Sequence, residues 1–311
     1  MNDSRYAKEW VKVLEYENQS LPQSASAEVD KILRMAVEDE NSQQIIKALI
    51  HQGKYELVID EQNDTVIFRN LNNMVEKSDD VVERAVLHSM LGELYLQYYR
   101  KEQWTIDQRT ELGDYVPADM KEWTRNIFYD KVVEHLNASI AAQRELEQAE
   151  VESYAAFITM GKDSRRFYPT MYDFLTRRAI EFFSQIDADE DLSRTLAKKN
   201  IQQQSLFAPA HKYVVLTFDP QPGEYNLRSL ETYRLLLSSL QTRALERSIL
   251  LTELDKLDYL SRLQNVYRSE ALPSLERLLE QWREREFSVE IIDKLAGLYQ
   301  NEIYRIEERD S

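Results

Sequence analysis

The chain has 311 residues, a formal net charge of −16 and a hydrophobic content of 43%. This apolar content excludes a disordered protein, and the negative charge argues against nucleic acid and anionic lipid as partners, because both repel an acidic surface. The absence of cysteine excludes disulfides, thiolate metal sites and cysteine nucleophiles. No apolar run approaches the ~18 residues of a membrane span, so we expect no membrane insertion of this segment.

Glycine and proline are scarce, with 6 and 7 residues respectively. Sheets need many turns, and turns use these two residues, so their scarcity favours long helices joined by short polar loops. We therefore predict an all-α fold. At most one short β segment is expected, near residues 213–218.

Apolar residues recur at helical spacing through the first half of the chain. The pattern predicts successive helices at about 4–16, 22–36, 41–55, 66–75 and 80–98, with Asn41 and either Asp79 or Asp80 as N-caps. The periodicity lapses between Trp104 and Tyr115, which predicts a loop. Pro117 is expected to start a long helix that ends near Glu147.

The stretch Arg165–Phe183, near the middle of the chain, carries four large apolar side chains in three helical turns, more than a surface helix needs. Pro169 suits the first helical position, because its ring fixes φ and it has no N–H to leave unpaired. One face carries large apolar residues at helical spacing, and the opposite face carries Asp173, Arg177 and Glu181 at four-residue intervals. We predict a core helix with ion pairs along its solvent face.

The second half contains a polar helix at 192–204, a possible strand at Tyr213–Phe218 and a strong turn signal at Pro220–Gly223. Four helices are expected after the turn, at about 227–240, 243–263, 273–286 and 288–303. We therefore expect an N-terminal helical array over residues 1–219. A four-helix segment of two hairpins, 220–311, is expected to continue it.

Two helices carry the same short pattern, L-[G/A]-x-x-Y, at Leu91–Tyr95 and Leu295–Tyr299. In tetratricopeptide repeats the small residue lets two helices touch, and the tyrosine packs across the groove between them. The other positions of that repeat do not recur in register. We predict an irregular array of helical hairpins resembling a tetratricopeptide-type α-solenoid, with a generic helical domain as the alternative.

Catalytic motifs are absent from the sequence. The six glycines are isolated, so no phosphate-binding loop and no G-x-S-x-G elbow can form. H-E-x-x-H is missing, and so is the E-x-x-H of di-iron bundles. The nearest approach to a metal-ligand cluster is Glu134-His135 with Asp130 one turn earlier, a grouping expected by chance among 55 acidic residues.

We interpret His135 as a solvated or core-edge histidine, and His88, beside the apolar stripe of its helix, as a partly buried one. Arg177 and Arg178 could bind an anion, but ion pairs with acidic neighbours on the same helix explain them more simply. We therefore predict that the protein is not an enzyme. No catalytic, cofactor-binding or metal-binding residue is assigned.

The chain resembles the helical N-terminal region of the large bacterial alpha-2-macroglobulin family proteins. The most specific likeness is Tyr168–Leu175 followed by Arg178-Ala179, which is similar to that family's P-T-L-Y-D-F-L-x-x-R-A segment. The likeness covers nearly all of the chain, and 244–260 is similar more loosely. Further similar segments are Tyr6–Trp10, Leu21-Pro22, Ile45–Leu49, His88–Tyr95, Tyr98-Tyr99, Trp104 and Arg109-Thr110.

The resemblance implies a non-catalytic helical scaffold in an exported, periplasmic or envelope-exposed protein of a protease-trapping family. The sequence has no macroglobulin domains, bait region or Cys-Gly-Glu-Gln thioester, so the trapping activity is not carried over. The implied partners are other domains of the parent chain or an envelope protein. The alternative is a free-standing cytoplasmic adaptor or regulator of the tetratricopeptide type. We further expect Asp173 and Arg178 to make fixed hydrogen bonds that hold neighbouring helices.

Overall fold

The protein is described from a computed structural model. The structure describes residues 3–59, 65–111, 113, 115–155, 157–158, 164–186, 190–263 and 265–309. The chain folds into two compact units, Met1–Phe182 and Phe183–Ser311, and each is described by itself.

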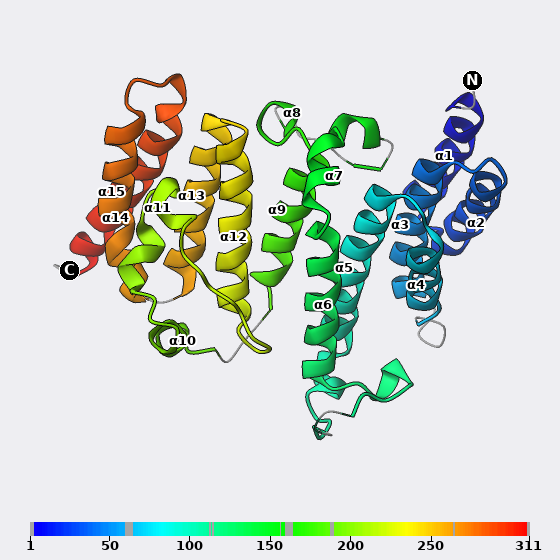
Figure 1. The fold of residues 1–311 in the computed structure, drawn as a ribbon. Helices are drawn as coiled ribbons and strands as arrows, with labels where there is room; N and C mark the ends of the chain where they lie inside the picture. The colour runs from blue at the N-terminus through cyan, green and yellow to red at the C-terminus, as the bar shows by residue number, and fades with distance from the viewer. Residues whose placement is uncertain are drawn as a thin grey trace. The chain divides into compact units, whose positions relative to one another are not determined.

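The first unit is a succession of helices in which neighbours in the sequence pack on one another, from α1 to α6 (Figure 1). The end of α9 passes into the second unit. The elements of the first unit are α1 (Asp3–Asn18), α2 (Pro22–Glu38), α3 (Ser42–Ile59), α4 (Val66–Lys77), α5 (Val81–Ile106), the 3-10 helix η1 (Met120–Glu122), α6 (Arg125–Ile140), α7 (Gln143–Gln148), η2 (Val151–Tyr154), α8 (Ser164–Phe167) and α9 (Met171–Phe183).

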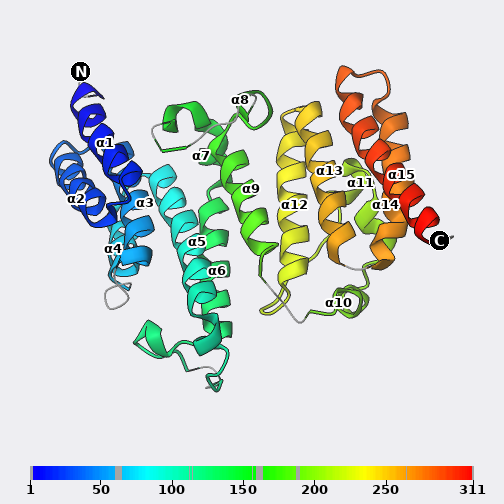
Figure 2. The same ribbon diagram turned by 180° about the vertical axis from the view of Figure 1, so that it is seen from behind.

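The second unit follows the same rule, with α12 on α13, α13 on α14 and α14 on α15, as the view from behind also shows (Figure 2). The short elements α10, α11 and η3 pack against α12 and α14. The bounds are α10 (Leu192–Lys198), η3 (Gln203–Phe207), α11 (Ala210–Tyr213), α12 (Tyr225–Thr242), α13 (Glu246–Leu263), α14 (Asn265–Trp282), η4 (Glu286–Ser288) and α15 (Val289–Arg309).

The all-α fold class is confirmed, since the described residues contain no strand. Their β contact is one isolated bridge between Glu150 and Thr170. The possible strand at Tyr213–Phe218 was wrong. Tyr213 ends α11, and its buried ring and that of Phe218 pack 5.6 Å apart within the second unit. The β-branched residues between the two aromatic rings suggested a strand, but this segment is a loop anchored by the rings.

The division between the units differs from the boundary expected after residue 219. Residues 192–213 contact α12 and α14 and belong with the last helices. The turn at Pro220–Gly223 reverses the chain inside the second unit, immediately before α12. A turn signal shows where a chain reverses, and it does not show which elements share a core.

Helix starts follow the expected capping chemistry. The backbone N–H of Gln44 donates to the Asn41 side chain at 3.2 Å, and that of Glu83 donates to Asp80 at 2.8 Å. Both contacts satisfy an N–H that has no partner within its helix. Pro22 occupies the start of α2 as predicted. Pro273 was expected to open a helix but lies inside α14.

Four helix ends are closed by residues other than glycine. Ser20, Glu40, Asn200 and Ala244 have φ between 49° and 57°, in the left-handed region. After each of them the next backbone N–H donates five residues back into the helix, as Asn41 does to the carbonyl of Ala36 at 2.9 Å. This is the Schellman end that usually uses glycine, and it lets the chain turn sharply with few glycines.

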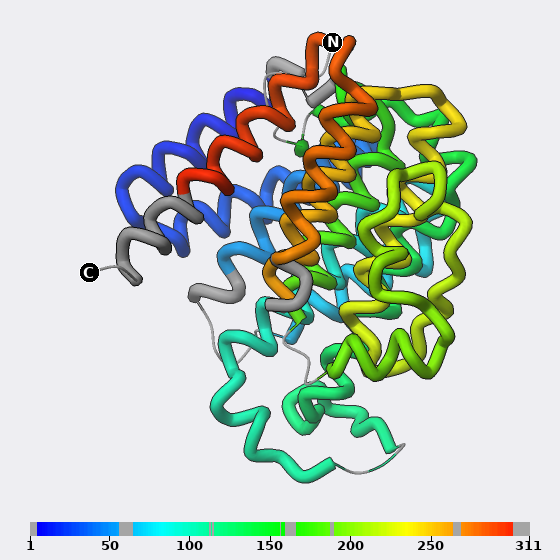
Figure 3. The backbone as a smooth tube through the Cα atoms, turned by 90° about the vertical axis from the view of Figure 1, so that its left-hand side faces the viewer, coloured from blue at the N-terminus to red at the C-terminus, as the bar shows by residue number. Residues whose placement is uncertain are grey.

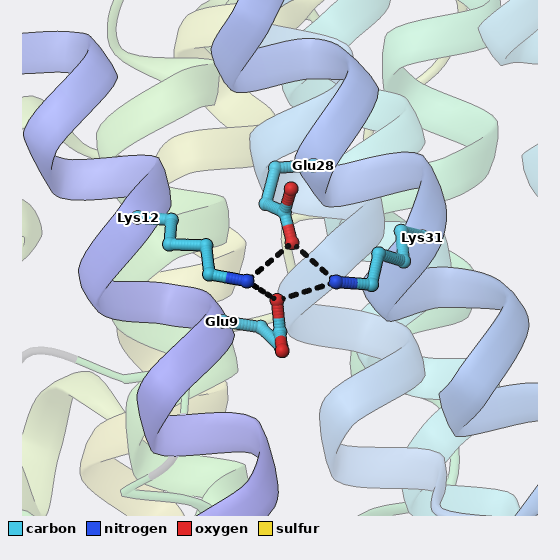
Figure 4. A network of polar contacts seen from close by, with 4 residues as sticks. All are labelled: Glu9, Lys12, Glu28 and Lys31. Carbon is cyan, nitrogen blue, oxygen red and sulfur yellow. Dashed lines mark hydrogen bonds and ion pairs between the residues drawn. The ribbon is translucent and has the colours of Figure 1, made fainter.

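A ring of four charged residues joins α1 to α2 on the surface of the first unit (Figure 4). The Glu9 carboxylate accepts from Lys12 at 2.6 Å and from Lys31, on α2, at 2.7 Å. Glu28 pairs with the same two lysines at 3.8 and 3.0 Å. Hydrogen bonds with Glu28 and the two lysines lower the pKa of Glu9 to about 2. The ring sets the register of α1 on α2, above a core that includes Tyr6, Val13, Val29 and Ile32.

Helix α5 is the most enclosed element of the first unit. Its buried residues fall on nearly every side of the helix, and α3, α4, α6 and α7 all contact it. At Gly92 the leucine side chain of α6 comes so close that an added Cβ would lie 2.8 Å from Leu136. The expected close approach at Gly92 is confirmed. Tyr95, one turn later, is also buried, 4% exposed.

The central helix α9 differs from the prediction at its start. It begins at Met171 and not at Pro169, because Thr170 is the capping residue. Asp173 is fully buried instead of facing solvent, and it accepts from the Thr170 backbone N–H at 3.1 Å and the Thr170 hydroxyl at 2.8 Å. The backbone of Met171 also donates to Ala149 at 2.8 Å, which fixes this start to the preceding segment.

Arg178 joins α9 to α5, as predicted. Its guanidinium donates to Glu93 at 2.5 Å and to Ser89 at 3.2 Å, and it lies 5.1 Å from the ring of Phe182. The hydrogen bonds between Asp173 and Thr170 confirm that the Asp173 side chain is held in place at the start of α9. Arg177 lies over the Tyr168 ring at 4.1 Å.

The long helix expected from Pro117 to Glu147 was wrong in its first part. Residues 115–124 are mostly extended around η1, and α6 starts at Arg125. Trp123 explains the difference, because its indole N–H donates to the Pro117 carbonyl at 2.8 Å and holds the segment in a closed loop. This connection projects beyond the ends of α5 and α6 (Figure 3).

Exchanging Gly92 for alanine is expected to lower the free energy of unfolding by about 1 kcal/mol. Alanine gains ~1 kcal/mol of helix propensity, but overpacking against Leu136 costs ~1–3 kcal/mol. Gly297→Ala is the matched control, because no atom lies within 4 Å of the added Cβ, and it should be neutral or stabilising. Urea unfolding measures both, and equal effects at the two sites would contradict the close approach.

Candidate functional site

Two histidines meet between α5 and α6, in the buried part of the first unit. The Nδ1 atoms of His88 and His135 lie 2.8 Å apart, and the His135 ring stacks on Tyr95 with 5.5 Å between centroids. One ring must donate and the other must accept, so each nitrogen in the contact is occupied. Glu134, beside His135 in the chain, pairs with Lys131 at 2.7 Å. The grouping noted in the sequence is therefore a histidine pair and a separate surface ion pair.

Burial governs how this pair titrates. Loss of solvent around His135, followed by the nearby His88, lowers the pKa of His135 to about 4. Burial also lowers the pKa of His88. Both rings are consequently neutral near pH 7, which leaves one Nδ1 able to accept from the other. The Nδ1 atom of each ring is used inside the helix pair.

The second unit contains a buried lysine and a buried glutamate on α13. Lys256 is 1% exposed, and its amine donates to the Leu206 carbonyl at 2.8 Å and to the Ala208 carbonyl at 3.4 Å. The amine also lies 3.7 Å above the Tyr213 ring. Glu253, one turn earlier, accepts from the backbone N–H of Ala210 at 2.6 Å. The two side chains anchor the η3–α11 segment to α13.

Burial lowers the pKa of Lys256 and raises the pKa of Glu253, each opposed by the charge of the other. A cavity of about 10 Å³ adjoins both residues, about the size of one water molecule. The second carboxylate oxygen of Glu253 is among the buried atoms without a hydrogen-bond partner in the described residues. The Lys256 amine is thus enclosed, and it anchors backbone carbonyls of the η3–α11 segment.

A groove of about 690 Å³ lies between α4 and the connection that leads into α6. We call it the α4 groove. Its floor is made of aromatic rings, with Tyr95 4.6 Å from Phe68 and 5.7 Å from Trp123. Asn72 donates to the Tyr95 hydroxyl at 3.4 Å, and Arg69 lies exposed on the rim. The volume falls within the ~300–1,000 Å³ of known ligand pockets.

The wall of the α4 groove is held by side-chain hydrogen bonds. Arg109 donates to the Trp123 carbonyl at 2.5 Å, and Thr124 donates to Glu111 at 3.0 Å. Next to this wall in the chain, Tyr115 is 63% exposed and Val116 52% exposed, and Trp104, on the last turn of α5, is 83% exposed. Large apolar residues on an ordered projection are typical of protein-binding surfaces.

A second groove, of about 710 Å³, runs between α13, α14 and α15, and we call it the α15 groove. Its apolar residues are Leu257, Ala271, Leu275 and Leu298. Its charged residues are Asp255, Asp258, Arg262, Asp293 and Lys294. Lys294 and Asp258 pair across it from α15 to α13.

Among the described residues no group of three or more histidine, cysteine or acidic side chains could hold a metal ion. None of the described helices is long and apolar enough to cross a membrane. Comparison with protein-family models, curated proteins and solved structures finds no match to this chain. The likeness to the macroglobulin family therefore stands on the sequence segments given above.

Sequence reasoning assigned no site residue, and both grooves and the buried pair were missed. Lys256 follows Glu253 by three residues inside an apolar helix, and this spacing was the available signal for a buried pair. The grooves had no such signal, because residues distant in sequence line them. Trp104 and Tyr115 were placed in a loop, and their exposure could have been inferred from it.

The histidine pair predicts a loss of stability in acid. The folded pKa of His135 is about 4 against 6.5 for a free histidine, so the unfolded chain takes up the proton first. Stability from this group is present above pH 6.5 and is lost as pH falls towards 4. At about 1.4 kcal/mol per pKa unit the loss is about 3 kcal/mol. Urea unfolding of the wild type should show this drop, and His135→Phe should lack it. The same pH slope in both proteins would contradict the assignment.

The buried pair predicts non-additive effects. Lys256→Met should destabilise the protein by about 3 kcal/mol, because it leaves the Leu206 carbonyl without its amine donor and Glu253 without a cation. Adding Glu253→Gln keeps an acceptor for the Ala210 N–H and removes the unpaired charge. The double variant should therefore cost less than the sum of the single variants. Additive costs in guanidinium unfolding would contradict the coupling.

Proposed function

We propose that this chain is a non-catalytic helical scaffold that binds a partner protein through the α4 groove. The observation that carries the proposal is the connection from α5 to the groove wall, where Tyr115 is 63% exposed, together with Trp104, which is 83% exposed on the last turn of α5. Exposed aromatic residues next to an aromatic-floored groove have no stabilising role in the folded chain. They are the residue types that dominate the energy of protein interfaces.

The buried titratable groups support a scaffold and not an enzyme. The histidine pair, Lys256 and Glu253 make hydrogen bonds to each other or to backbone. A catalytic group needs an open path to a substrate, and these groups are enclosed. The open surfaces of the chain are instead the two grooves, each lined by several helices.

We also propose a tetratricopeptide-like arrangement of the helical hairpins within each unit. Two features support it. Helices adjacent in sequence pack on one another, and Gly92 and Tyr95 take the positions expected for the repeat pattern. The second copy does not pack in this way, since Ala296 is exposed and Tyr299 is 48% exposed. The array is therefore irregular, and its repeats are distinguished by packing more than by sequence.

The resemblance to bacterial macroglobulins supports a cellular context for the scaffold. We propose that it acts in an exported, periplasmic or envelope-exposed protein and contacts other domains of the parent chain or an envelope protein. Its net charge of −16 disfavours nucleic acid as the partner. Reading the coding sequence on both sides of this segment tests the context. An export signal and macroglobulin domains are expected, and a stop codon directly after Ser311 would contradict them.

A comparison of captured proteins tests the site. The immobilised chain is exposed to envelope extract, and bound proteins are quantified by mass spectrometry. We expect a protein that the wild type retains to fall by about thirtyfold with the double variant Arg69→Glu/Tyr115→Ser, since each change removes an exposed contact worth ~1 kcal/mol. The control is Val215→Ser, because Val215 is 76% exposed but lies in the second unit. An identical captured set for all three proteins would contradict the proposal.

A further inference from the structure

The α15 groove combines an apolar floor with an acidic surround. Leu257, Ala271 and Leu275 are all buried beneath it, at 5%, 6% and 4% exposure. Three aspartates line it, against one arginine and one lysine. The chain as a whole carries −16. Both the local and the total charge therefore favour a cationic occupant.

One of the two cationic side chains at this groove already forms an ion pair. Lys294 pairs with Asp258 across the groove, where the two side chains are 40% and 48% exposed. An ion pair this exposed contributes little, about 0–1 kcal/mol. A cation from outside could exchange with Lys294 at small cost. Asp255 accepts from the Tyr233 hydroxyl at 3.0 Å. This bond orients the carboxylate, but a neutral hydroxyl does not neutralise its charge.

Gly297 keeps the groove open on the α15 side. No atom lies within 4 Å of a Cβ added there, so any larger residue could occupy the position without meeting the rest of the chain. Alanine costs about 1 kcal/mol less than glycine inside a helix. Gly297 thus has a low helix propensity, and it lies where a larger side chain would narrow the groove.

We propose that the α15 groove binds a basic, amphipathic segment of a partner protein, with its apolar side chains on the leucine floor and its lysine or arginine side chains on the aspartates. Asp293 and Asp258 supply the charge at the two walls, and the Lys294–Asp258 pair opens to admit the incoming cation. This site is separate from the α4 groove and does not depend on it.

Defined peptides test the proposal on the full chain. One probe is a dye-labelled helical peptide of leucine and lysine at amphipathic spacing, and the second has glutamate in place of every lysine. Fluorescence anisotropy should show binding of the lysine peptide, weakened by salt, and no binding of the glutamate peptide. Equal binding of the two peptides would overturn the proposal.

Three variants separate the groove from general attraction to an acidic chain. Gly297→Trp fills the groove without changing the charge and should lower the affinity for the lysine peptide about tenfold. Gly297→Ala should leave that affinity unchanged. Lys294→Gln removes the competing cation and should tighten binding about two- to fivefold, as expected for an exposed ion pair. Circular dichroism confirms that the variants fold. Unchanged affinity with Gly297→Trp, or weaker binding with Lys294→Gln, would overturn the site.

Discussion

The burial of α5 on nearly all sides is the constraint on which the first unit depends. A helix with buried residues on nearly every side needs several neighbours to cover it, and α3, α4, α6 and α7 all contact α5. Gly92 allows α6 to approach closely, and Arg178 brings α9 against the remaining polar positions of α5. The α4 groove follows from the same arrangement, because Tyr95 of α5 forms its floor together with Phe68 of α4 and Trp123, which precedes α6.

In the second unit, charged side chains inside the core help to cover α13. The segment before α12 contributes short elements that cannot cover α13 with a regular helix. Lys256 and Glu253 reach out to that segment and satisfy its backbone groups. Buried charged groups are a poor source of stability compared with apolar packing, so the value of these two side chains is positional. They place residues 203–213 in the second unit, where the turn at Pro220 suggested a boundary.

The sequence predicted the helices well because their apolar periodicity is strong and turn residues are few. It predicted their ends poorly where local chemistry overrides periodicity. Thr170 and Asp173 cap α9 two residues after the expected proline, and the indole of Trp123 delays the start of α6. The strand prediction at 213–218 failed because β-branched residues favour strands, whereas the rings of Tyr213 and Phe218 anchor this segment as a loop. The grooves and the histidine pair depend on contacts between helices, which no periodicity in a single sequence reveals.

The four left-handed helix ends have a consequence for how stable this protein can be. A residue with a side chain costs about 1 kcal/mol or more in this conformation, with asparagine the most tolerant. Ser20, Glu40 and Ala244 together therefore cost about 3 kcal/mol, a sizeable part of the ~5–15 kcal/mol that holds a typical domain folded. The low glycine content that favours an all-α fold thus lowers the stability of that fold at its helix ends. Evolution of a more thermostable relative would have simple steps available at these positions, away from both grooves and without repacking any core.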